Sequence, residues 1–311
     1  MDLFAGRRKP GWMAIAMGDG RIRAAHAHAG VAGKPQVTLC EVFDDRGDPL
    51  QALSALRRRL GLARYRVSLL LSPRDYQFVQ IERPPVEAAE LKSAAAWAVK
   101  DLTDIPPERA TLDVLPVPMP DQLAGRTPQL LVACAENETL ARHIQLFQRA
   151  RIRLERIDIP ECAQRNISAV CVGPEHCVAM LGFGEQGGML TFTRGGELFA
   201  ARRLELTQAQ VNDALASNQH GVLDRIVLEI QRSLDNFQNK YHVIPVARLL
   251  LAPLEQGEAL RAFLAENLDL AIEPVWLPES LDCAAVPGLV NGAMQSQCLG
   301  VLGAALRMEA A

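Results

Sequence analysis

Short apolar runs and helical apolar spacings follow one another in the same order in two parts of the chain. In the first part, three apolar runs predict strands at 12–17, 22–27 and 37–43. Gly18, Asp19 and Gly20 supply the tight turn between the first two strands. Leucines at helical spacing between 50 and 60 predict a helix, and the continuous apolar run at 67–71 predicts a buried parallel strand.

The same order returns after about residue 175. Apolar runs predict strands at 177–182, 189–193, 197–204 and 248–252. Thr207 and Gln210 form a capping box, and a long apolar face at 222–237 predicts the helix that precedes the last of these strands. A helix at 254–267, a strand at 271–275 and a final helix at about 295–307 complete the pattern.

Repetition of this unit predicts two related α/β domains, each a sheet with a hairpin edge and a parallel remainder. We expect the first domain at 1–170 and the second at 171–311, with the last helix a candidate for packing back on the first domain. Residues 75–150 lie outside the repeat. Their pattern of strand, helix, two strands and helix predicts an inserted α+β subdomain.

Composition narrows the class of protein. Apolar residues make up 49% and charged residues 22% of the 311, as in ordinary globular proteins. A net charge of −3 argues against the domain-wide positive field that binds nucleic acid. Basic clusters lie at Arg7 to Lys9, at Arg57 to Arg66 and at Arg149 to Arg156. We interpret them as solvated faces, with contact of Arg7, Arg8 and Lys9 with anionic lipid as the alternative.

The chain contains no apolar run of about 18 residues, and charged residues occupy the position of a signal peptide's apolar region. These features predict a cytoplasmic protein. The seven cysteines are scattered without a CxxC pair, so reduced and mostly buried thiols are expected.

Several stretches resemble one family. The runs YQFVQIERPP at 76–85, EL…AW…KDL between 90 and 102, LDV at 112–114, RIDIPE at 156–161 and RSLD at 232–235 resemble the type IV pilus assembly PilM family, and within it most the MshI proteins of mannose-sensitive hemagglutinin (MSHA) pili. The resemblance implies an actin-like, ribonuclease H-like α/β fold of two domains with the subdomain inserted in the first. It also implies a cytoplasmic protein peripheral to the inner membrane.

The resemblance further implies a partner, a PilN-like inner-membrane protein called MshJ in hemagglutinin pili. PilM-like proteins bind its short cytoplasmic N-terminal tail in the groove beside the inserted subdomain. Here the candidate partner-binding residues are Leu91, Ala94, Trp97 and Lys100 on the helix predicted at 87–101. Most helical tryptophans are packed, so we expect Trp97 to be a core residue, with an exposed binding role as the alternative. The sequence leaves a homo-oligomer open.

Actin-like ATPases carry an acid and a glycine on the first hairpin of each domain, where turn amides cradle phosphate and the carboxylate positions the metal. Ala16 replaces the first acid, and strand alternation points Asp19 elsewhere. The run from Met180 to Gly184 contains no acid before Glu185, and Pro253 stands where the adenosine-side glycines are expected. The degenerate cleft would keep only Gly18, Asp19, Gly20, Gly182 and Gly184.

We therefore expect an adaptor that is not an enzyme, with no catalytic residues and no cofactor, although weak ATP binding stays open. His26 and His28 share one side of a strand but have no third ligand nearby, so a surface or half-buried pair is favoured over a metal site. Two alternatives remain. One is an actin-fold ATPase or phosphotransferase with relocated acids, and the other is a GspL-like cytoplasmic component of a type II secretion platform.

Overall fold

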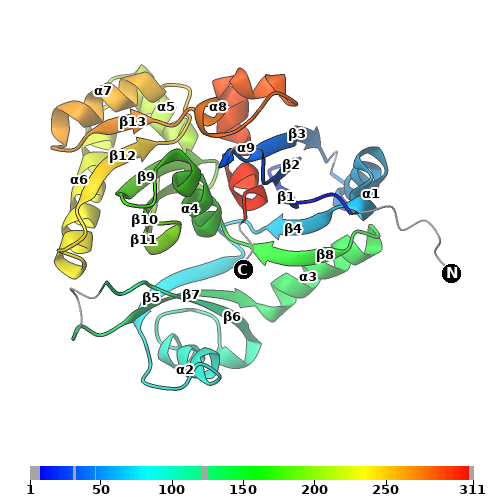
Figure 1. Cartoon of the computed structure of the whole chain (residues 1–311), viewed down its shortest axis with the longest axis horizontal. Helices are drawn as coiled ribbons and strands as arrows, with labels where there is room; N and C mark the ends of the chain where they lie inside the picture. Colours follow the sequence, from blue (N-terminus) through cyan, green and yellow to red (C-terminus); the bar gives the residue numbers. More distant parts are fainter. Residues whose placement is uncertain (1–7, 31–32, 46, 121–124, 308–311) are drawn as a thin grey trace.

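The structure is a computed structural model that describes residues 8–30, 33–45, 47–120 and 125–307. Its first sheet has the strand order β3-β2-β1-β4-β8 (Figure 1). These strands are β1 (Trp12–Gly18), β2 (Arg21–His28), β3 (Gln36–Asp44), β4 (Arg66–Leu70) and β8 (Leu154–Asp158). The first three are antiparallel, and β4 and β8 continue the sheet parallel to β1.

The second sheet repeats this topology in the order β11-β10-β9-β12-β13. Its strands are β9 (Cys177–Gly184), β10 (Gly187–Arg194), β11 (Glu197–Leu204), β12 (Val246–Leu251) and β13 (Ile272–Pro274). Again three antiparallel strands are followed by two parallel ones. The repeat seen in the apolar pattern therefore corresponds to a repeat of sheet topology.

Two helices lie between the sheets, α4 (Pro160–Cys171) and α9 (Gly292–Ala305). α9 is apolar around most of its circumference, and its last five residues, 301–305, are all buried. It follows the second sheet in sequence but contacts β1, β2 and β4 of the first. Small residues on the facing strand surfaces, Ala14, Ala25 and Ala27, allow this close packing.

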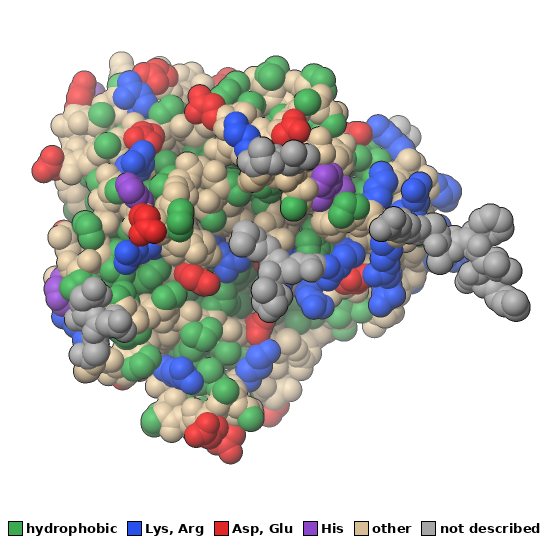
Figure 2. Space-filling model, in the orientation of Figure 1, with side chains coloured by type: hydrophobic (Ala, Val, Ile, Leu, Met, Phe, Trp, Pro, Cys, Tyr) green, Lys and Arg blue, Asp and Glu red, His purple; other side chains and the backbone are tan. Residues whose placement is uncertain are grey.

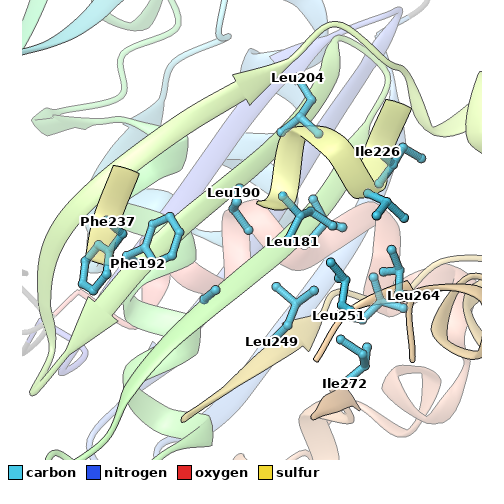
Figure 3. Close-up of a cluster of buried hydrophobic side chains, with 14 of the residues drawn as sticks. Leu181, Leu190, Phe192, Leu204, Ile226, Phe237, Leu249, Leu251, Leu264 and Ile272 are labelled. Atoms are coloured by element: carbon cyan, nitrogen blue, oxygen red, sulfur yellow. The ribbon is translucent and has the colours of Figure 1, made fainter. Parts of the chain in front are cut away.

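The outer faces of both sheets are covered by further helices. α1 (Pro49–Leu60) and α3 (Asn137–Arg149) pack on the first sheet, where Met13, Ile15 and Ile22 point away from α9. α6 (His220–Lys240) and α7 (Gly257–Asn267) cover the second sheet, and Figure 3 shows the core between them. In that core the rings of Phe192 and Phe237 stack with centroids 4.5 Å apart. The described residues also form α5 (Gln208–Ala216), α8 (Leu277–Ser280) and the 3-10 turns η2 (Leu62–Arg64), η3 (Pro107–Arg109) and η5 (Pro287–Val290).

A third, antiparallel sheet has the order β5-β7-β6. It consists of β5 (Tyr76–Glu82), β7 (Gln129–Glu136) and β6 (Ala110–Pro116), with α2 (Leu91–Ala98) on one face. Leu91, Ala95 and Val99 recur every four residues and form the buried side of α2. The other face of this sheet packs on both five-stranded sheet domains. Phe78 and Leu115 on this face contact the hydrophobic cores of both.

Local signals in the sequence are confirmed where they are strong. Gly61 ends α1 in the left-handed conformation at φ 64°, and Thr207 and Gln210 form the predicted capping box. The helix expected at 87–101 is shorter, since only Leu91–Ala98 is α-helical. β8 and α4 were not predicted. β8 is only five residues long and three of them are charged, whereas α4 has an apolar side at helical spacing that was overlooked. Among the described residues, no helix is both long and apolar enough to cross a membrane.

Candidate functional site

A cavity of about 290 Å³ opens between the two five-stranded sheets. Its walls are the β1–β2 turn, the β9–β10 turn, the start of α4 and one side of α9. Gly18, Asp19, Gly182 and Gly184, predicted from sequence as a degenerate nucleotide cleft, all line it, whereas Gly20 does not. The fold therefore brings the two hairpins together over one cavity.

Asp19 corrects one expectation. Asp19 was a candidate cleft residue, but strand alternation was expected to point it differently from Ala16, whereas both residues line the cavity. The reason is local: β1 ends at Gly18, and Asp19 takes a left-handed turn conformation at φ 52°, so the alternation no longer applies. Ala16 itself faces the cavity without a polar group, as the sequence indicated.

Side chains of the two hairpins contact each other directly across the cleft. Arg23 of β2 donates to Glu185 of the β9–β10 turn at 3.0 Å. The Ser72 hydroxyl, just after β4, donates to Gln186 Oε1 of the same turn at 2.6 Å. Asp19 hydrogen-bonds Glu185, and this bond lowers the pKa of Asp19 and raises the pKa of Glu185. The acids at this end are therefore engaged with opposing protein groups.

Glu161 is the cavity acid that sequence reasoning did not assign to the cleft. It is 1% exposed at the start of α4 and lines the cavity. Arg203 of β11 donates to Glu161 Oε1 through Nη2 at 3.1 Å and through Nε at 3.2 Å, and its Nη1 reaches the Pro73 carbonyl at 2.6 Å. Glu161 lies three residues beyond β8, and ligand sites gather at the carboxyl ends of parallel strands, but this signal was missed because β8 itself was not predicted.

Tyr76 completes this buried cluster. Its hydroxyl donates to Glu161 Oε2, and the Arg203 guanidinium lies 4.5 Å from its ring centroid. Burial, reinforced by the negative charge of Glu161, raises the pKa of Tyr76 well above its ordinary value, so the hydroxyl stays protonated and donates. Tyr76 of the third sheet and Arg203 of the second sheet thus meet at Glu161 of α4.

Gly182 lies in a tightly packed position. A Cβ at this position would lie 3.2 Å from both the Ala252 Cβ and the Gln164 Oε1. Gln164 in turn donates to the Met180 carbonyl at 2.7 Å and to the Thr191 hydroxyl at 3.0 Å. Ala252 and Pro253 line the cavity where the adenosine-side glycines were sought.

The histidine pair differs from the half-buried arrangement expected. His26 is fully buried. Its Nε2 donates to the Pro10 carbonyl at 2.9 Å, and its Nδ1 lies 2.6 Å from the Thr38 hydroxyl oxygen. Burial lowers the pKa of His26 to about 4. His28 is partly exposed, with its ring centroid 5.9 Å from that of His26. Among the described residues, no three His, Cys, Asp or Glu side chains are grouped as a metal site would need.

The candidate partner-binding residues of α2 divide between two faces. Leu91 is buried in the third sheet's core, and Ala94 is half-buried. Trp97 is 68% exposed, so the expectation of a core tryptophan is wrong. The apolar face of α2 is set by Leu91, Ala95 and Val99, and Trp97 lies roughly opposite. The Lys100 ammonium stands 5.9 Å from the Trp97 ring centroid, and both side chains face solvent.

No protein-family model matches the chain, and no curated protein matches it. Solved structures do match. A chain of the PilM–PilN type IV pilus biogenesis complex has a TM-score of 0.73 at 19% identity, covering 95% of this chain and 98% of that chain. A protein with an actin-like ATPase fold and unknown function from Bacteroides thetaiotaomicron has a TM-score of 0.50 at 11% identity, covering 89% and 95%. The chain has the actin-like fold.

The cytoplasmic domain of EpsL, an inner-membrane component of the Vibrio cholerae type II secretion system, has a TM-score of 0.53 at 13% identity. The aligned region covers 91% of this chain and 99% of the EpsL chain. In all three comparisons the actin-like similarity therefore extends over nearly the whole length of both proteins. The repeated sheets and the cavity between them are the features of this fold that carry the candidate site.

Proposed function

We propose that the chain is an actin-like assembly component of a type IV pilus biogenesis machine, which binds the cytoplasmic tail of a PilN-like inner-membrane protein. The observation that carries the proposal is the similarity to the PilM–PilN complex over 95% of this chain. Sequence runs such as YQFVQIERPP at 76–85 support it. Their resemblance to MshI refines the proposal to an MSHA-type pilus, with an MshJ-like partner.

This function places the protein at the cytoplasmic face of the inner membrane, where the partner's tail emerges. The third sheet and α2 are the proposed docking region. Trp97 and Lys100 offer an exposed aromatic ring and a cation, and aromatic anchors often dominate such interfaces.

Trp97→Ala is expected to weaken binding of the partner's tail peptide about tenfold or more, as loss of an interface anchor does. Because the side chain is 68% exposed, the variant should fold normally. Binding is measured by calorimetry with the N-terminal peptide of the PilN-like protein. Trp276→Ala, at an exposed tryptophan between β13 and α8, is the matched control and should bind normally. Equal affinities of both variants and the parent would contradict the role of Trp97, whereas no binding by the parent would contradict the proposed function.

We further propose that the cleft does not support ATP hydrolysis. Ala16 offers no carboxylate to a metal, and Glu185 and Glu161 already pair with Arg23 and Arg203. ATP would bind weakly in such a site, because the negative charge of its phosphates would not be compensated.

The expected calorimetric result is a magnesium-ATP dissociation constant above about 1 mM, corresponding to about −4 kcal/mol or weaker. Hydrolysis should not exceed that of Gly18→Arg, which places a long side chain in the cavity. Micromolar binding, or hydrolysis that Gly18→Arg abolishes, would instead favour an ATPase with relocated acids. Asp19 and Glu161 would be its candidate acids, because both line the cavity.

The type II secretion alternative rests on the similarity to EpsL. Pull-down with the PilN-like tail, and separately with the cytoplasmic segments of secretion-platform proteins from the same organism, discriminates between the two machines.

A further inference from the structure

Three basic clusters that are far apart in the sequence meet at one end of the first sheet. The sheet register pairs Trp12 with Arg66 and Val67 with Leu154, so the starts of β1, β4 and β8 lie side by side. The backbone N–H of Lys9 donates to the Arg64 carbonyl at 2.8 Å, which fixes the entering chain against η2. α1 and α3 pack together and lead into β4 and β8, so both end here as well.

The charge at this end is one-sided. The segments 8–12, 57–66 and 149–156 contain eleven Lys or Arg and a single acid, Glu155, whereas the whole chain has a net charge of −3. Figure 2 shows the blue side chains gathered over this end, beside the point where the chain enters β1. We call this set of segments the basic end. Arg7, considered earlier with Arg8 and Lys9, lies outside the described residues.

Contacts within the protein neutralise only part of this charge. Glu155 is shared by Arg8 at 2.8 Å, Arg66 at 3.4 Å and Arg153 at 3.8 Å, and Arg59 pairs with Glu41 of β3 at 2.7 Å. The side chains without an ion pair among the described residues include Arg58, Arg64, Arg149 and Arg151, all exposed. The negative ends of two helix dipoles favour basic residues in the last turns of α1 and α3, but this effect does not extend to Arg64 or Arg151.

Arg151 is informative because its backbone conformation is unfavourable for a residue that has a side chain. It follows α3 with φ 57°, the left-handed conformation that glycine or asparagine adopts most easily. Helix termination therefore does not account for an arginine at this position. Its exposed charge adds to that of Arg153 and Arg64 at the same end.

The character of the surface indicates the kind of partner. None of the large hydrophobic side chains that are exposed in the described residues belongs to the three segments of the basic end: Trp97, Leu102, Ile144, Leu228, Trp276 and Val290. The basic end therefore has neither the apolar centre of a protein interface nor exposed rings for stacking on bases. It also lies outside the cavity between the sheets. Positive charges spread over several elements are attracted by a partner whose negative charge is also spread over a broad surface.

We propose that the basic end binds an anionic phospholipid surface. This goes beyond the proposed function, because it requires no pilus partner. Attraction of this kind acts within a Debye length of about 8 Å at physiological ionic strength, so the end itself would rest against the headgroups.

The test is sedimentation of the full chain with vesicles of phosphatidylcholine, with and without phosphatidylglycerol. Binding is expected only with phosphatidylglycerol and should be lost at high salt. The combined variant Arg58→Gln, Arg64→Gln and Arg151→Asn should bind about 100-fold more weakly, since each basic residue near an anionic surface contributes about fivefold. Arg151→Asn suits the left-handed backbone, so this part of the change should not cost stability.

The matched control removes three exposed charges elsewhere, as Arg109→Gln, Arg225→Gln and Arg232→Gln, and should bind as the parent does. Equal loss in both triple variants would overturn the assignment to the basic end, as would binding that ignores lipid charge. Binding of duplex DNA as tight as binding of the vesicles would overturn the membrane as the partner. None of these outcomes depends on the peptide experiment, so the two proposals fail separately.

Discussion

Gly303→Ala is expected to lower the free energy of unfolding by about 3 kcal/mol or more, at the upper end of what overpacking usually costs. A Cβ at Gly303 would lie 2.2 Å from the Ala163 carbonyl oxygen and 2.7 Å from its carbonyl carbon. These are backbone atoms of α4, so no rotamer change can relieve the clash. α4 and α9 would have to separate, and the hydrogen bond from Asn166 Nδ2 to the Gly303 carbonyl at 2.9 Å would be disturbed with them.

Urea unfolding followed by circular dichroism measures this effect. Gly292→Ala is the matched control on the same helix, because no atom lies within 4 Å of the added Cβ. That variant should be unchanged or up to about 1 kcal/mol more stable, as alanine is the better helix former. If Gly303→Ala unfolds at the same urea concentration as the control, the close contact between α4 and α9 is not what holds the two sheets in place.

Arg203→Met is expected to cost about 2 kcal/mol of stability. The substitution leaves the carboxylate of Glu161, 1% exposed, without its cation, and breaking a buried pair from one side costs about 3–5 kcal/mol. We expect less here because the Arg203 side chain is 38% exposed and water partly replaces it. Since Arg203 also donates to the Pro73 carbonyl, the substitution should also loosen the contact between the second sheet and the connection from β4 to β5.

Arg202→Met provides the comparison on the adjacent residue. Arg202 pairs with Glu229 at 2.6 Å on the opposite side of β11, with 45% of its side chain exposed, and loss of a pair of this kind costs less than about 1 kcal/mol. Thermal unfolding of both variants gives the difference. Adding Glu161→Gln to Arg203→Met should restore part of the stability, because the buried charge is then gone. No recovery in the double variant would show that Arg203 acts through its packing on Tyr76 instead.

The predicted strands and hairpins agree with the structure because their signals are local. An apolar run bounded by turn residues determines β1, β2 and β4 without reference to the rest of the chain. The replacement of the expected acid by Ala16 is equally local, and Ala16 does face the cavity. The direction of Asp19 and the exposure of Trp97 were predicted incorrectly. The first depends on the turn conformation, and the second depends on which side of α2 meets the third sheet.

By itself, the sequence determined most of the strands and helices, the repeat and the absence of an acid from the first strand, because each follows from neighbouring residues, whereas β8 and α4 were missed. Only the tertiary structure decided which distant groups meet. It joined the partly exposed Arg203 to the buried Tyr76 and Glu161, and it linked the two hairpins through Arg23 and Glu185. It also gathered three separate basic clusters at one end, because parallel pairing of β1, β4 and β8 aligns their starts. Periodicity carries no information on such pairings, since they arise from the packing of elements that are remote in the chain.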